Sequence, residues 1–120
     1  MAEFMLLMRN EGIPMANLSE EEQGAVMAEW GAWMGNLQEK GQLKGGLPFN
    51  PESAVVINNK GEVSKGYYTQ GSGVNVGGFI HLDVANIDEA IAIAKTTPGL
   101  HTEASTIEVK EFMNMEAPAE

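Results

Sequence analysis

The stretch "GGFIHLDVANIDEAIAIAKTTP", residues 77–98, decides the fold of this chain. Its first part alternates apolar and polar residues, which predicts a strand over 78–85. Asn86 or Asp88 then begins a helix that Pro98 and Gly99 end. The expected inner stripe of this helix consists of Ile87, Ala90, Ile91 and Ala94.

The predicted strand has two unlike faces, because side chains alternate along a strand. The aliphatic residues Ile80, Leu82 and Val84 belong under the helices, and Phe79, His81 and Asp83 point the other way. His81 and Asp83 are about 7 Å apart along the backbone. A carboxylate beside an imidazole orients it for proton transfer near neutral pH, so both are candidate catalytic residues. The alternative is a half-wet sheet, or a histidine satisfied across a dimer interface.

The first part of the chain predicts a strand and a long helix. "EFMLLMR", residues 3–9, indicates a buried strand. Ser19 and Glu22 have capping-box spacing at the start of a helix within residues 17–41 that Lys40 and Gly41 close. The apolar stripe of this helix is Val26, Trp30, Trp33 and Leu37. Its interior glycines are Gly24, Gly31 and Gly35, and we expect close packing beside the tryptophans to compensate for them.

The middle of the chain is rich in Gly, Asn and Pro, and predicts strands over 42–46, 54–58 and 63–68 with a loop over 69–73. "GSGVNVGG", residues 71–78, lacks a Walker lysine and precedes a strand, so it indicates a mobile loop and not a phosphate site. The last predicted strand, 104–113, directs Ile107 and Val109 to one side. The other side receives Thr106, Glu108 and Lys110.

The order strand, helix, strands, strand, helix, strand predicts an α+β fold of the ferredoxin-like, split βαβ type. Its sheet is antiparallel, and both helices cover one face. The other face is either wet or covered by the sheet of a second subunit. We expect one domain over residues 1–115 and a frayed tail over 116–120.

Composition excludes several classes of function. The net charge of −10 over 120 residues disfavours nucleic-acid binding. The chain has no cysteine, which excludes thiolate chemistry and suits the cytoplasm. No apolar run is long enough to cross a membrane, and the start of the chain does not fit a secretory signal.

The chain resembles the YCII-related family, which includes the DGPF proteins. The resemblance is carried by "LLMR", by W-x-x-W-x-x-x-L-x-x-x-G-x-L-x-x-G-x-P from Trp30 to Pro48, by "GGF" before a strand, by "DEAIAIAK-x-x-P" and by "IEV". It implies a homodimeric α+β barrel in the cytoplasm, with two sheets enclosing a pocket. The chain departs from the DGPF motif, since Lys65-Gly66-Tyr67-Tyr68 stands in its place and the motif aspartate is absent.

Other candidate site residues follow from position. Arg9 is an anion anchor or half of a surface salt bridge. Tyr67, Phe79 and His101 are further candidate substrate contacts. We expect no metal and no cofactor, since a metal site would need His81, Asp83 and Glu108 to converge, and a haem site would need His81 or His101 as an axial ligand.

Two functions remain open on the sequence alone. The first is a homodimer that binds a small molecule between its sheets, with acid–base chemistry at His81 and Asp83. The second is a non-catalytic accessory or regulatory dimer whose pocket is filled by side chains. Related barrels catalyse cofactor-free oxygenation, isomerisation and dehalogenation, and a fold by itself does not choose among them.

Overall fold

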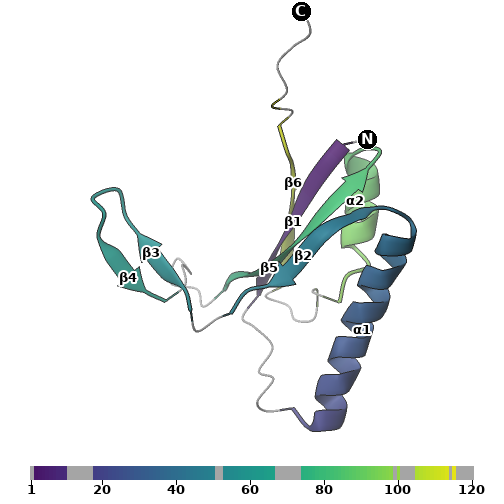
Figure 1. Ribbon diagram of the computed structural model, residues 1–120, viewed down its shortest axis with the longest axis horizontal. Helices are drawn as coiled ribbons and strands as arrows, with labels where there is room; N and C mark the ends of the chain where they lie inside the picture. The colour runs from purple at the N-terminus through teal and green to yellow at the C-terminus, as the bar shows by residue number, and fades with distance from the viewer. Residues whose placement is uncertain are drawn as a thin grey trace, which may run out of the picture.

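The computed structural model of the protein describes residues 2–10, 18–50, 53–66, 74–98, 100, 105–113 and 115. Its elements, in chain order, are β1 (Ala2–Asn10), α1 (Glu20–Glu39), β2 (Leu43–Pro48), β3 (Val55–Ile57), β4 (Val63–Lys65), β5 (Asn75–Val84), α2 (Ile87–Ala94) and β6 (Thr106–Glu111). Four strands form a sheet in the order β2-β5-β1-β6, and β3 pairs with β4 in a separate hairpin (Figure 1).

The topology confirms the predicted α+β, ferredoxin-like fold. β5 lies between β1 and β2, which α1 connects, and β1 lies between β5 and β6, which α2 connects. All three pairings in the sheet are antiparallel. In the sheet, α1 lies over β2, whereas α2 lies over β5, β1 and β6. Each βαβ unit is therefore split by a strand of the other.

The core lies between the sheet and the helices. β1 contributes Phe4, Leu6 and Met8, and β5 contributes Ile80, Leu82 and Val84, none of them more than 5% exposed. Leu37 of α1 and the alanines at 90 and 94 of α2 close the cluster from above. The predicted orientation of the aliphatic residues of β5 is therefore confirmed. Burying each such side chain stabilises the fold by about 1.5–3 kcal/mol.

Helix α1 begins and ends as its sequence predicts. The N–H of Glu22 donates to the Ser19 hydroxyl, and the N–H of Ser19 donates to the Glu22 carboxylate, which lowers the pKa of that carboxyl. At the other end Gly41 has φ +70°, and the N–H of Gln42 donates to Leu37 O, which is a Schellman closure. Both tryptophans pack against the core, and Trp33 Nε1 donates to Thr96 Oγ1 at 2.9 Å.

The buried face of α2 differs from the predicted stripe. Ala90 and Ala94 face the core, but Ile87 is 48% exposed and Ile91 is 37% exposed. Ile93, which is not part of the predicted stripe, packs against the core instead. The helix is rotated so that its alanines lie against the sheet, because their small side chains let α2 approach the strands closely.

The prediction of close packing around the glycines of α1 is also wrong. An added Cβ at Gly24, Gly31 or Gly35 would meet no atom of the described chain within 4 Å, apart from near neighbours in the helix. The tight approaches occur in the sheet instead. A Cβ at Gly46 would lie 2.9 Å from Phe79 O, and one at Gly78 would lie 2.9 Å from Leu47 O. These two glycines let β2 and β5 pair closely.

Several strand ends differ from the prediction. The prediction of a loop over 71–78 is wrong for its second half, because β5 begins at Asn75 and Gly78 pairs with Pro48 of β2. β4 ends at Lys65, where Gly66 follows with φ +99°. β6 is shorter than predicted and spans Thr106–Glu111. The expected tail over 116–120 lies outside the described residues.

The glycines give a direct test of this packing. We expect Gly31→Ala to raise the free energy of unfolding by about 1 kcal/mol, because alanine favours the helix and its Cβ enters open space. Gly46→Ala should lower it by about 1–3 kcal/mol, because the added methyl overlaps Ile80 Cδ1 and a carbonyl oxygen. Urea unfolding followed by circular dichroism measures both changes. A destabilising Gly31→Ala would contradict the open surroundings of that position.

Candidate functional site

The face of the sheet opposite the helices, called here the open face, carries the candidate residues. In the parts of the chain that the structure describes, no helix covers it. It displays alternate residues of the four strands: Leu47 of β2, Phe79, His81 and Asp83 of β5, Glu3, Met5, Leu7 and Arg9 of β1, and Thr106, Glu108 and Lys110 of β6. The face therefore combines apolar and charged side chains, as the alternation predicts.

His81 is held by a carboxylate from the neighbouring strand. Its Nε2 lies 2.8 Å from Oε1 of Glu3, and the imidazole is 28% exposed. The Phe112 ring lies beside it, with the two ring centroids 4.9 Å apart. Met5 is the residue directly across from His81 on β1. The imidazole thus has a charged partner on one side and apolar neighbours on others.

The carboxylate at the imidazole is Glu3 and not Asp83, which corrects the expected orienting role of Asp83. Residues two apart in one strand are about 7 Å apart, whereas diagonal neighbours on adjacent strands are within reach of a long side chain. Asp83 pairs with Glu3 across the strands, and its side chain makes no hydrogen bond to a described residue. Glu3 shares the alternation of Met5, Leu7 and Arg9, but only the register of β1 against β5 brings it to His81.

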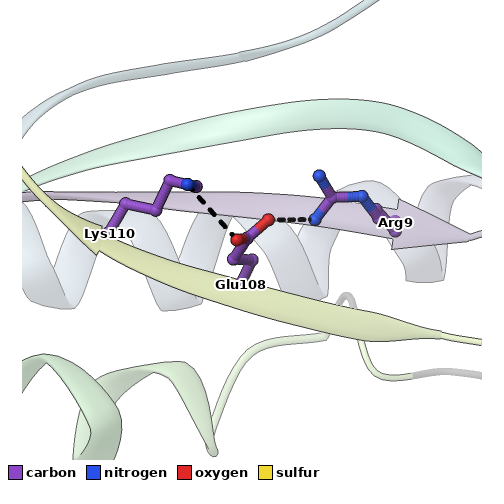
Figure 2. Close-up of polar contacts among 3 residues, drawn as sticks. All are labelled: Arg9, Glu108 and Lys110. Carbon is purple, nitrogen blue, oxygen red and sulfur yellow. Dashed lines mark hydrogen bonds and ion pairs between the residues drawn. The ribbon is translucent and has the colours of Figure 1, made fainter.

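Arg9 lies at the other end of the open face, in an ion pair. Its Nη1 donates to Glu108 Oε1 at 2.6 Å, and Lys110 Nζ lies 3.4 Å from the other carboxylate oxygen. Figure 2 shows Glu108 between the two cations. The hydrogen bond from Arg9 lowers the pKa of the Glu108 carboxyl. Arg9 therefore forms a salt bridge, which is one of the two roles expected for it from its position.

Apolar side chains occupy the middle of the open face. Phe79 pairs with Leu7 on one side and with Leu47 on the other, and its ring centroid lies 5.9 Å from that of Phe49. Leu47 and Phe49 are 66% and 52% exposed, so the apolar surface around Phe79 continues onto them. The two remaining candidates, Tyr67 and His101, lie outside the described residues.

The described residues give no metal centre, since none of their carboxylates and histidines gather in a group of three that could hold an ion. Glu108 pairs with Leu7, which is four residues along β1 from the row that contains Glu3 and Asp83. Neither α1 nor α2 has the length and apolarity to span a membrane.

The fold and this face define the class of protein as a small α+β, ferredoxin-like domain with a mixed polar and apolar sheet face. The chain belongs to the YCII-related family, because the model of the YCII-related domain matches residues 3–114. The family suspected from the sequence is thereby confirmed. No curated protein matches the chain.

The Arg9–Glu108 pair predicts a pH-dependent contribution to folding. The pKa of Glu108 is lower in the folded protein than its ordinary value of 4.5, because Arg9 donates to the ionised form. The stabilisation is therefore present above pH 4.5 and is lost as the pH falls through the lowered pKa. Glu108→Gln should be less stable than wild type at pH about 7, and the small difference should shrink towards pH about 3.

Urea unfolding of both proteins across this range measures the difference in free energy. Glu111→Gln is the matched control, since Glu111 lies on the same strand and its carboxylate makes no ion pair with a described residue. A Glu108→Gln difference that stays constant with pH would contradict the ion pair.

Proposed function

We propose that the protein is a homodimer that binds a small organic molecule between the open faces of two copies, with His81 transferring a proton. The observation that carries the proposal is the His81–Glu3 pair, 2.8 Å apart, on a sheet face that no described helix covers. Proton-transfer groups in proteins commonly combine such a pair with apolar surroundings. Phe112 and Met5 supply the apolar surroundings here.

The contact with Glu3 favours one tautomer of the neutral imidazole. When Nε2 carries the proton it donates to Glu3, and Nδ1 is then free to accept one from a ligand. No described residue forms a hydrogen bond with Nδ1. Asp83 pairs with Glu3 across the strands and so places a second carboxylate residue beside the one that contacts His81. In this proposal Glu3 is the positioning residue and His81 is the catalytic residue.

The layout of the open face indicates the class of ligand. Met5, opposite His81, and Arg9 are four residues apart on β1, which is about 13 Å. Phe79 and Leu7 lie between these two ends. Arg9 has five N–H donors, and among the described residues only Glu108 accepts from it. The face fits an elongated organic acid whose carboxylate meets Arg9 and whose apolar middle lies over Phe79.

A second copy would give this ligand an enclosed site. The exposed rings and aliphatic side chains around Phe49 and Leu47 would lose contact with water when two sheets pack at about 10 Å. Interactions with a charged ligand strengthen when water is excluded. We further propose that the dimer is cytoplasmic, because the cysteine-free sequence suits a reducing compartment.

The proposal predicts stabilisation by aryl carboxylic acids such as phenylpropionate and hydroxybenzoates. A ligand at about 100 times its Kd stabilises a protein by about 2.7 kcal/mol. For a chain of this size that raises Tm by on the order of 10 °C. We expect Arg9→Gln and His81→Gln each to remove most of this shift, measured by thermal unfolding. Sedimentation velocity on the same samples should show a dimer.

Lys44→Gln is the control, since it removes an exposed positive charge from β2 outside the rows of the proposed site. It should keep the wild-type response to the acids. A dimer that none of the acids stabilises would favour the non-catalytic alternative. A chain that stays monomeric at all concentrations would contradict the enclosed site.

A further inference from the structure

The β3–β4 hairpin has a shape of its own, set by its turn. The Asn58 side-chain oxygen accepts from the N–H groups of Lys60 and Glu62, each at 2.9 Å. Gly61 has φ +82°, a conformation that glycine adopts without strain. At the open end the N–H of Gly66 donates to Ala54 O at 2.8 Å. The hairpin is therefore defined by local hydrogen bonds and does not take its form from the rest of the domain.

One face of this hairpin is apolar and exposed. Val55 is paired with Lys65, and Ile57 is paired with Val63, so these four side chains share a face. Val55, Ile57 and Val63 are 56%, 63% and 62% exposed. We call these three residues the hairpin strip. The opposite face carries Val56 and Ser64.

The hairpin stands clear of the domain. Figure 1 shows it projecting away from both helices, with the four-stranded sheet in between. The molecule extends only 22 Å along the viewing direction, and the hairpin is separated from the helices across the two longer directions. β3 and β4 pack on each other, and neither has more than a slight contact with another described element. A two-stranded hairpin is marginal by itself in water, so its apolar strip indicates a covering surface.

Charge points to a second copy of this chain as that surface. The chain carries a net charge of −10, whereas residues 54–66 contain two lysines, Lys60 and Lys65, and one glutamate, Glu62. Lys65 lies on the same face as the hairpin strip. A basic, apolar ribbon on an acidic molecule is complementary to the remainder of another such molecule.

The position of the hairpin agrees with its charge. It extends on the side away from the helices, which is the side where a copy packed on the open face would lie. We infer that the hairpin is an arm that lays the hairpin strip on the partner subunit, reciprocally in the two halves of a symmetric dimer. This inference rests on the proposed dimer, and adds to it a contact that the sheet faces do not make.

Two neighbouring residues on opposite faces of β4 provide a matched test. Val63→Asp places a charge in the hairpin strip, and Ser64→Asp places the same charge on the other face. Both positions are exposed in the single chain, so neither variant should unfold it. Each dimer buries two arms, so we expect Val63→Asp to raise the dimer Kd by about 100-fold and Ser64→Asp to leave it within about threefold.

Sedimentation velocity over a concentration series measures the Kd of wild type and both variants, and circular dichroism checks that each remains folded. A dimer that Val63→Asp weakens selectively supports the arm. If wild type is a dimer and Val63→Asp is equally tight, the arm is overturned while the sheet-to-sheet dimer stands. If the wild-type protein is a monomer, both the arm and the sheet-to-sheet dimer are overturned.

A second measurement does not depend on affinity. The chain has no cysteine, so Ile57→Cys creates a single attachment site for a photoreactive benzophenone. Irradiation of the labelled dimer, followed by peptide mapping, should give cross-links between subunits at that position. Mixing labelled protein with an isotopically distinct copy tells such links from those within one chain. Links confined to one chain would overturn the arm.

Discussion

The burial of alternate side chains on the two central strands is the constraint on which this structure depends. β1 and β5 place Phe4, Leu6, Leu82 and Val84 under the helices with at most 1% of their surface exposed. Because the period of a strand is two, a shift of either strand by one residue would turn this set towards water. The burial of one face thereby determines which residues occupy the other. The candidate site consists of the side chains that the core leaves outside.

β1 also organises the polar groups of the open face. Its first half directs Glu3 to His81 on β5, and its second half directs Arg9 to Glu108 on β6. The Glu3–His81 contact and the Arg9–Glu108 ion pair therefore join β1 to both of its neighbouring strands. Between the pairs the face is apolar, around Leu7 and Phe79. On β1 and β5 this arrangement places polar groups at both ends of the face and Leu7 and Phe79 between them, while Glu108 of β6 lies directly beside Leu7.

Much of the fold could be predicted from residues 77–98, because alternation in the strand and the helix directly after it agree on one topology. The capping box at Ser19 and Glu22 could also be predicted, because it depends only on residues three positions apart in the sequence. The partner of His81 could not be predicted, because the register of strands far apart in sequence is set by tertiary packing.

The buried face of α2 could not be predicted for a different reason. Apolar residues lie on most sides of that helix, so their spacing does not indicate which side is buried. They are Ile87, Ala90, Ile91, Ile93 and Ala94. The sequence leading up to Gly78 predicts a loop and not a strand, since the close approach of β2 that requires a glycine there depends on tertiary packing.

The irregularity between Met8 and Arg9 has a consequence for how this chain can change over evolution. Met8 pairs with Gly78 but Arg9 pairs with Val76, so Gly77 is one residue more than the pairing needs. A bulge of this kind absorbs an odd insertion without inverting the strand. Only Asn75 and Val76 lie beyond it in β5, far from the buried half of the strand. We therefore expect the fold to tolerate the insertion or deletion of a single residue at the start of β5. An insertion or deletion between Phe79 and Val84 would instead turn the buried side chains of β5 towards water.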